Sequence, residues 1–242
     1  MKYLLNLQNG KTSKGEKLGF LTGVLYLAPA ETSGRWNLCP SSTAGCRAGC
    51  LAFAGRVEME SPTGKIWRAR NERTELLMRH RAEFLARLSK EIRALIKKAK
   101  RENLTPCVRL NGTSDLPFLP LTVCPLFPEI QFYDYTKIPI AQNDARLKLP
   151  NYHLTFSRSE SNGDDVARAI EQGVNVAVPF DIQRGKPLPS TWNEYTVIDG
   201  DISDLRFKDV RASRGVIVGL RSKGNAHRKL QSRNNNPFIV KL

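Results

Sequence analysis

The stretch that decides the fold is CVRLNGTSD, residues 107–115, in which a short apolar run passes directly into a polar cluster. The same arrangement occurs in IQFYDYTK at residues 130–137 and in YHLTFSRSES at residues 152–161. Polar clusters that follow strands directly are typical of parallel sheets, whose carboxyl ends meet at one site. The sequence therefore predicts an α/β fold, namely an irregular or incomplete TIM-like (β/α) barrel, with an open α/β sheet as the alternative.

Further predicted elements flank that stretch on both sides. A strand is expected at residues 19–27, and a long helical region at residues 63–101 has apolar residues spaced three and four apart. The remaining expected elements are a helix at residues 164–173 and strands at residues 174–180, 195–198 and 215–220. Because no repeat or linker divides the chain, residues 1–242 are expected to form a single domain.

The charge balance is strongly basic. The 242 residues include 38 Lys and Arg against 23 Asp and Glu, which gives a net charge of +15. Residues 65–101 and residues 210–242 hold this excess, and the second stretch contains no acidic residue. Such a charge favours a polyanionic partner, most often nucleic acid. The candidates for phosphate contacts in the C-terminal basic stretch are Arg221, Lys223, Arg228, Lys229 and Arg233.

Several protein classes are disfavoured. No apolar run approaches the roughly 20 residues of a membrane-spanning helix, and the N-terminus lacks the apolar core of a signal peptide. Five cysteines, an odd number, favour reduced thiols over a disulfide framework. The sequence thus predicts a protein of the cytoplasm without a membrane partner.

A cysteine-rich loop is predicted at residues 29–56, directly after the first strand. It contains Cys39, Cys46 and Cys50 among Gly, Ser and Ala residues, which permit the tight turns that wrap an ion. Zinc is the first interpretation of this loop, and a [4Fe–4S] cluster is the alternative. Three cysteines at the mouth of a barrel resemble the ligands of radical S-adenosylmethionine enzymes, although those enzymes have a shorter cysteine spacing. Three unligated thiols are a further possibility.

The fourth ligand of such a site is less clearly indicated. We take His80 as the candidate, and the spacing leaves His153, His227, Cys107 and Cys124 open as well. Cys107 and Cys124 each lie beside or within an apolar run. They are more simply explained as small buried residues of the core.

Carboxylates follow several of the predicted strands. Asp115 follows the first of the three strand-and-cluster units, Asp134 lies in the second, and Asp199 and Asp201 follow a later strand. Two carboxylates on one rim of a barrel can supply the nucleophile and the proton-handling group for exchange at a glycosidic bond. The three histidines of the chain make a Ser-His-Asp hydrolase a poor alternative.

Two stretches resemble a known group of proteins. The loop CPSSTAGCRAGCLAFAGR at residues 39–56 and the run VRLNGTSDLP at residues 108–117 resemble an uncharacterised phage family. We associate that family with phage DNA transglycosylases of the DpdA type, which are relatives of the tRNA-guanine transglycosylases. The resemblance implies a TIM-like barrel, a bound zinc ion, and replacement of guanine in double-stranded DNA by a 7-deazaguanine base such as preQ0. In the tRNA enzymes the zinc cysteines lie late in the chain, whereas here they lie early.

The resemblance also implies roles for individual residues. The early catalytic aspartate maps onto Asp115 and the late one onto Asp201; one is the nucleophile of a covalent intermediate and the other handles the proton. A flipped nucleotide would enter the same rim. The residues expected to line the base pocket are Asn111, Ser114, Asp134, Ser157, Arg158 and Asp199.

Two other functions are open on the sequence. One is an iron–sulfur enzyme of the radical S-adenosylmethionine type in phage nucleotide metabolism. The other is a non-catalytic DNA-binding protein that a metal stabilises. Polar clusters at several successive strand ends favour an enzyme over a simple binding protein. The expected location in each case is the cytoplasm of the infected bacterium, and the oligomeric state is left open.

Overall fold

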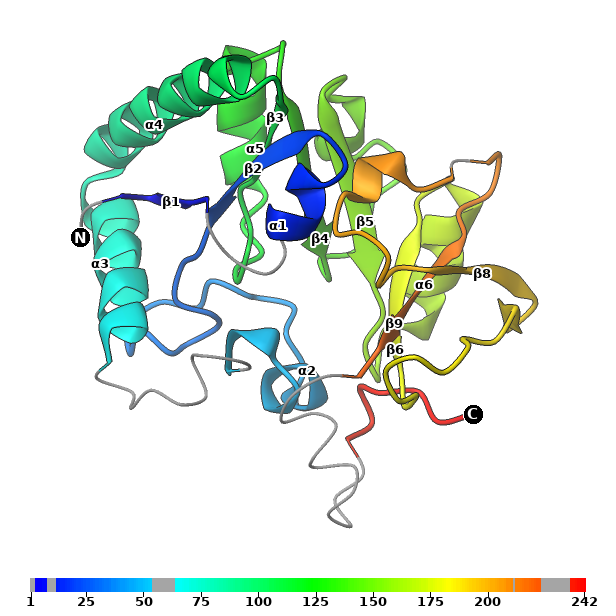
Figure 1. Ribbon diagram of the computed structural model, residues 1–242. Helices are drawn as coiled ribbons and strands as arrows, with labels where there is room; N and C mark the ends of the chain where they lie inside the picture. Colours follow the sequence, from blue (N-terminus) through cyan, green and yellow to red (C-terminus); the bar gives the residue numbers. More distant parts are fainter. Residues whose placement is uncertain (1–2, 8–11, 54–63, 211, 223–235) are drawn as a thin grey trace.

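The computed structural model describes residues 3–7, 12–53, 64–210, 212–222 and 236–242 (Figure 1). Its centre is a nine-stranded sheet with the order β1-β2-β3-β4-β5-β6-β9-β8-β7. The strands are β1 (Leu5–Asn6), β2 (Phe20–Leu25), β3 (Thr105–Arg109), β4 (Gln131–Thr136), β5 (Tyr152–Ser157), β6 (Val176–Phe180), β7 (Thr191–Trp192), β8 (Tyr195–Asp199) and β9 (Ile217–Arg221).

Seven neighbouring strands of this sheet are parallel. The run from β2 through β6 follows the order of the sequence, and β9 and then β8 continue it on the far side of β6. The short strands β1 and β7 pair antiparallel with their neighbours and form the two edges of the described sheet. The predicted α/β class with parallel strands is therefore confirmed. The described sheet has two edges, so it is not a closed TIM barrel.

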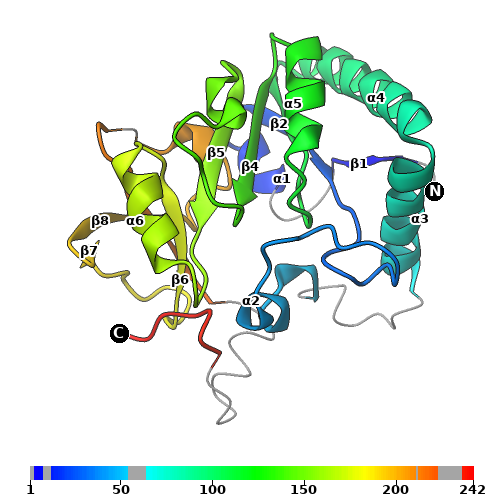
Figure 2. The same ribbon diagram turned by 180° about the vertical axis from the view of Figure 1, so that it is seen from behind.

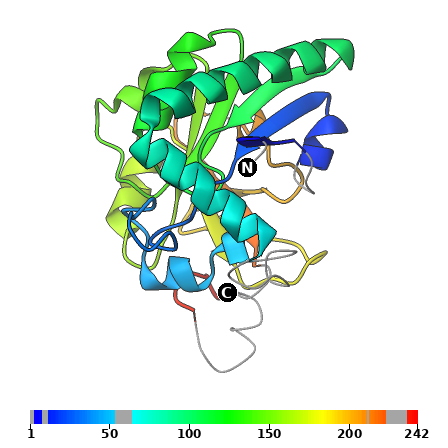
Figure 3. The same cartoon turned by 90° about the vertical axis from the view of Figure 1, so that its left-hand side faces the viewer.

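The described helices lie between the strands in the sequence. They are α1 (Thr12–Glu16), α2 (Ala44–Ala48), α3 (Lys65–Arg79), α4 (Arg81–Arg101), α5 (Phe118–Val123) and α6 (Gly163–Glu171), with short 3-10 turns η1 (Leu51–Phe53), η3 (Cys124–Leu126), η4 (Ala145–Lys148) and η5 (Arg206–Lys208). The predicted helical region at 63–101 is two helices, because His80 leaves the helical conformation with φ −131° and ψ 55°. In Figure 3, α3 and α4 lie nearest the viewer.

One face of the sheet packs against the helices. Side chains point alternately to the two faces of a strand, so every second residue of each parallel strand reaches this layer. The resulting core joins the strand residues Leu21, Val108, Phe132, Phe156 and Val178 to Phe84, Leu88, Ile92, Leu119, Val166 and Ile170 of the helices. Figure 2 shows α5 and α6 in front of the sheet. Cys124 belongs to this core, as the sequence predicts.

The opposite face of the sheet is covered by residues 200–209, which include η5. Leu205 packs there against Cys107 of β3 and Tyr133 of β4. The ring of Phe207 lies 5.3 Å from Phe20 and 5.4 Å from Tyr133 between ring centres. The predicted burial of Cys107 is confirmed, because it is fully buried in this second, smaller cluster.

Candidate functional site

The cysteine loop crosses the carboxyl edge of the parallel sheet. We use this name for residues 29–53, the described part of the predicted loop; residues 54–56 lie outside the described residues. In Figures 1 and 2 the loop, with α2, lies beyond the ends of β5 and β6. The carboxyl edge is where parallel α/β sheets carry their binding sites, so this loop marks the candidate site.

The Cys39 end of the loop is fixed to the turn after β3. The Cys39 thiol donates to the Thr113 carbonyl with an S–O distance of 3.6 Å and accepts from the Ala30 amide at 3.3 Å. The Asp115 amide donates to the Leu38 carbonyl at 2.8 Å. The two stretches in which the sequence resemblance lies are therefore in direct contact.

The Cys50 end of the loop is fixed by α3. Arg70, which is only 5% exposed, donates from its Nη1 to the Ala52 carbonyl at 2.9 Å. Its guanidinium lies over the rings of Trp67 and Tyr26, with 5.1 and 5.8 Å to the ring centres. A buried cation is thereby held beside the last of the three cysteines.

The three thiols are close enough to influence one another. Burial raises the pKa of Cys39 to about 12 and also raises that of Cys50, and the neighbouring thiols contribute to both increases. Lys137 and Arg70 act in the opposite direction on Cys50. Buried thiols of this kind are protonated at neutral pH unless a metal displaces the proton. Within the described ranges, no three His, Cys, Asp or Glu side chains are grouped tightly enough to hold a single metal ion.

The structure does not group the described fourth-ligand candidates with the three cysteines of the loop. His80 lies at the α3–α4 junction, next to Arg79, whose guanidinium lies 5.7 Å from the ring centre of Trp36 in the loop. His153 is the second residue of β5 and lies near the amino edge of the sheet, while Cys107 and Cys124 lie in the two cores. His227 is outside the described residues. None of the four described candidates completes a four-ligand site with the loop.

Asp115 lies at the site, but both of its carboxylate oxygens are engaged. Oδ1 accepts from the Thr136 hydroxyl at 2.8 Å, and Oδ2 accepts from the Lys137 amide at 2.7 Å. Burial raises its pKa, and these hydrogen bonds oppose the increase. The side chain therefore ties the turn after β3 to the end of β4, which is a structural task.

Asn111, Ser114 and Asp134 form one buried network. Asp134 accepts from the amide of Asn111 at 2.7 Å, from its Nδ2 at 3.2 Å and from the Tyr152 hydroxyl at 3.2 Å. Asn111 Oδ1 in turn accepts from the Ser114 hydroxyl at 2.9 Å. Asp134 points to the helix-covered side, and burial raises its pKa to about 7. The structure brings these three predicted residues together, in the core rather than in an open pocket.

Asp199 ends β8, Asp201 follows it, and both are bound by Arg221 of β9. The guanidinium contacts both oxygens of Asp199 at 2.9 Å and Oδ2 of Asp201 at 3.1 Å. Four strands separate β8 from β3 in the sheet, and no hydrogen bond or ion pair joins Asp201 to Asp115 among the contacts of the described residues. The guanidinium of Arg221, predicted to contact phosphate, is directed at two carboxylates of its own chain.

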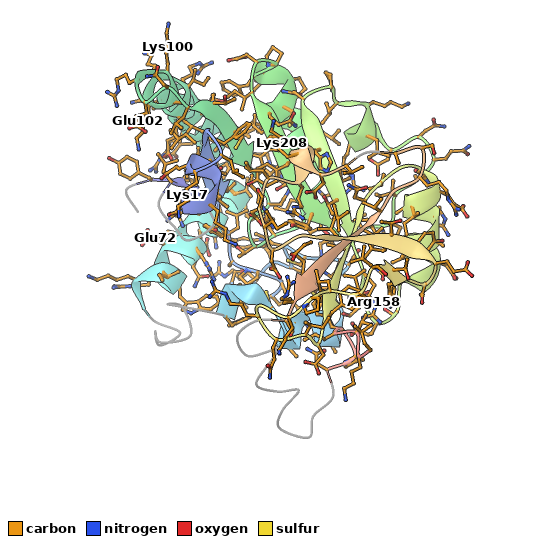
Figure 4. The ribbon with its side chains drawn as sticks, turned by 45° about the vertical axis from the view of Figure 1, so that its right-hand side comes forward. Lys17, Glu72, Lys100, Glu102, Arg158 and Lys208 are labelled. Atoms are coloured by element: carbon orange, nitrogen blue, oxygen red, sulfur yellow. The ribbon has the colours of Figure 1, made fainter. Side chains whose placement is uncertain are left out.

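Ser157 and Arg158 lie at the carboxyl end of β5, beside the cysteine loop. The Lys137 ammonium donates to the Ser157 hydroxyl at 2.9 Å and lies over the ring of Phe238, 5.0 Å from its centre. Arg158, labelled in Figure 4, donates to the carbonyls of Pro237 and Phe238 at 3.0 and 2.7 Å. The other predicted phosphate-binding residues, Lys223, Arg228, Lys229 and Arg233, lie outside the described residues.

A polar group on the face of the sheet that residues 200–209 cover was not anticipated from the sequence. Arg109 of β3 pairs with Asp204 at 3.2 Å, and its guanidinium lies 4.7 Å from the ring centre of Tyr135. The Nε of Arg109 is buried and has no hydrogen-bond partner among the described residues. Side chains alternate between the two faces of a strand, so Arg109 lies on the same face of β3 as Cys107, which belongs to the second core. This alternation is the signal in the sequence that could have located Arg109.

Two hollows lie elsewhere on the molecule. One of about 300 Å³ lies at the amino ends of β5 and β6, beside His153 and Asn175. The other, of about 460 Å³, is a shallow depression along α3 between Arg68 and His80. Neither is at the carboxyl edge, where the predicted site residues gather. No helix in the described ranges is long and apolar enough to cross a membrane.

Comparison with known proteins gives one result. A sequence model of the family described as gene product 88 matches residues 3–236. No curated protein and no solved structure matched the chain significantly. Because the match covers almost the whole chain, this protein belongs to the gene product 88 family.

Proposed function

We propose that this protein is an iron–sulfur enzyme whose [4Fe–4S] cluster is held by Cys39, Cys46 and Cys50. The observation that carries the proposal is the position of the cysteine loop, which follows the first parallel strand and lies over the carboxyl edge of β3 to β5. Iron–sulfur clusters are held by cysteine thiolates. A cluster is larger than a zinc ion, so the thiolates that bind it lie further apart than those that bind a single ion. This spacing is compatible with three cysteines that are not grouped tightly enough for one metal ion.

The ligand set also favours a cluster over structural zinc. A structural zinc site is almost always closed by four protein ligands. Among the described residues, none of the suggested fourth ligands completes a four-ligand site with the three thiols, and His227 lies outside the described residues. Three thiolates on a four-iron cluster leave one iron open to a small molecule, and the bound cluster would supply one-electron chemistry with S-adenosylmethionine.

The fold is consistent with this assignment. We infer that the sheet is an incomplete (β/α) barrel, because β2 to β6 follow one another in sequence order and their helices lie on one face. Residues 200–209 then fill the face that would line the barrel. Lys137 and Ser157 would face a ligand at the carboxyl edge, and Arg70 would hold the end of the loop.

The substrate is proposed from charge. The net charge of +15 favours a polyanion, so we propose a nucleic acid or nucleotide substrate in the cytoplasm of an infected bacterium. Within the described ranges, Lys137 has no carboxylate within ion-pair distance of its ammonium, so it is a cation at the site that an anionic substrate group can approach.

The test is cleavage of S-adenosylmethionine by protein reconstituted with iron and sulfide without oxygen. With reductant present, the wild type should turn brown and cleave S-adenosylmethionine, and Cys46→Ser should do neither. Cys124→Ala is the matched control, because Cys124 lies in the helix-covered core, and it should keep the cluster. Colourless wild-type protein after reconstitution would contradict the proposal.

DNA base exchange is the second candidate. It rests on the resemblance of residues 39–56 and 108–117 to phage DNA transglycosylases of the DpdA type and on the basic charge. It would use Asp115 and Asp201 as the catalytic pair and zinc in the cysteine loop. Incubation with double-stranded DNA and labelled preQ0 tests it directly. Incorporation that disappears in Asp115→Asn would support this candidate, and DNA binding without any chemistry would indicate a metal-stabilised binding protein.

A further inference from the structure

The part of the cysteine loop around Cys46, here called the Cys46 turn (residues 43–46), is held by one carboxylate, that of Glu160. Glu160 lies in the turn between β5 and α6. Its Oε2 accepts from the Thr43 hydroxyl at 2.7 Å, and its Oε1 accepts from the Gly45 amide at 2.8 Å. Thr43 is the N-cap of α2, the helix that carries Cys46, and Gly45 lies in the first turn of that helix. Thr43 Oγ1 itself accepts from the Cys46 amide at 3.1 Å.

The same turn is also held from the C-terminal side. The side chain of Asn236, which is 6% exposed, donates from Nδ2 to the Gly45 carbonyl at 3.0 Å. A side chain added at Gly45 would place its Cβ 2.7 Å from both Asn236 Oδ1 and Glu160 Oε1, closer than atoms pack. Position 45 is therefore enclosed between the turn after β5 and the C-terminal segment, residues 236–242.

That C-terminal segment is itself attached to the sheet. Val240 exchanges two backbone hydrogen bonds of 2.8 Å with the end of β6, donating to Pro179 and accepting from Asp181. Arg158 binds the carbonyls of Pro237 and Phe238. The Cys46 turn thus rests on two supports that both originate at the carboxyl ends of β5 and β6.

We propose that Glu160 is a positioning residue that sets the place of Cys46 over the carboxyl edge, and that Asn236 couples this turn to the C-terminal segment. A carboxylate suits the task because hydrogen bonds to ionised acceptors are about twice as strong as neutral ones. The inference deepens the proposed function, because the Cys46 thiol must meet those of Cys39 and Cys50 to hold a cluster.

The first test uses the metal-free protein, so it does not depend on the cluster. The rate at which a thiol reagent modifies Cys46 is measured by mass spectrometry in Glu160→Gln. Loss of the charge-assisted bonds should raise that rate by about fivefold or more, while Cys39 should be unchanged. Glu171→Gln is the matched control, because Glu171 is exposed on α6, and it should label like the wild type. Equal labelling of Cys46 in the two variants would overturn the proposal.

A second set of variants keeps the test decisive if Glu160→Gln folds poorly. Thr43→Val removes the hydroxyl that bonds Glu160, and Thr43→Ser retains it. Labelling of Cys46 should increase in the first and stay at the wild-type rate in the second, and Asn236→Ala should behave like Thr43→Val. A rise in Thr43→Ser equal to that in Thr43→Val would count against the proposal.

Reconstitution with iron and sulfide separates the two claims. Glu160→Gln should retain less iron than the wild type and Glu171→Gln should retain as much. If the wild type binds no iron while Glu160→Gln still labels faster at Cys46, the proposed function fails and the positioning role stands. If the wild type binds iron and Glu160→Gln matches it in iron content and labelling, the positioning role fails alone.

Discussion

The carboxylates at the strand ends and the thiols of the cysteine loop occupy the same edge of the sheet but differ in how they are bonded. Asp115, Asp134 and Asp201 each accept two or more hydrogen bonds from the protein. The thiols of Cys39 and Cys50 make only weak bonds to backbone groups, although the loop is anchored at several points. A carboxylate whose oxygens are already taken is poorly suited to attack a substrate. Thiols without strong hydrogen bonds, on a loop that is anchored at several points, are better suited to hold a ligand.

The substitution with the largest expected effect is Cys46→Ser, which tests whether the thiols hold a ligand. We expect complete loss of bound iron and of S-adenosylmethionine cleavage, because two thiolates do not replace three. Iron content and visible absorbance after reconstitution measure the outcome. Full iron retention in Cys46→Ser would show that Cys46 holds no ligand and has a purely structural task, like the hydrogen-bonded carboxylates.

The second effect is on stability, at the carboxylate network. Asn111→Ala removes the Nδ2 donor to Asp134 and the Oδ1 acceptor for Ser114 in a buried site, so the free energy of unfolding should fall by about 3 kcal/mol. Denaturant unfolding measures this decrease. The exposed Asn143→Ala serves as the control and should change stability by less than about 0.5 kcal/mol. An equal, small change in both variants would show that the network contributes little.

The third effect is a pH dependence at Asp134. Burial raises its pKa in the folded protein to about 7, above the ordinary value of 3.8. Between those two pH values the folded state binds more protons than the unfolded state, so this carboxyl lowers stability as pH rises. Relative to Asp134→Asn, the wild type should lose up to about 1.4 kcal/mol of unfolding free energy per pH unit in this window. A constant difference between the two proteins from pH 4 to pH 7 would argue against the raised pKa.

The smallest effect is expected at Asp201. Asp201→Asn leaves Arg221 paired with Asp199, so it should cost less than about 1 kcal/mol of stability and leave the chemistry of the site intact. Thermal unfolding and the cleavage assay measure both. Loss of activity in a folded Asp201→Asn protein would transfer the catalytic role to the carboxylates and favour base exchange.

The local pattern of the sequence predicts the fold well where apolar periodicity is strong. The strands around residues 107–110, 130–133 and 152–156 and the helix that ends near Gly173 occur where their patterns indicate. The break at His80 is not predicted, because the apolar stripe continues across it. The cover formed by residues 200–209 depends on contacts of Leu205 and Phe207 with distant strands, which no local pattern reveals.

The candidate site is predictable in composition but not in bonding. The polar clusters after β3, β4 and β5 do meet at one edge, as parallel strands require. Whether a given aspartate is free or bonded depends on partners such as Thr136 and Arg221, which are 21 and 20 residues distant from Asp115 and Asp201. Glu160 was missed for the same reason, because one glutamate within SRSES has no distinguishing neighbour.

The most direct measurement of the central claim is the metal content of the wild type beside a variant with Cys39, Cys46 and Cys50 all changed to Ser. Both proteins are reconstituted without oxygen, offered iron, sulfide and zinc together, and analysed for the three elements. The account predicts about four iron and four sulfide per wild-type chain and none in the variant. One zinc per wild-type chain without iron, or equal metal content in the two proteins, would contradict it.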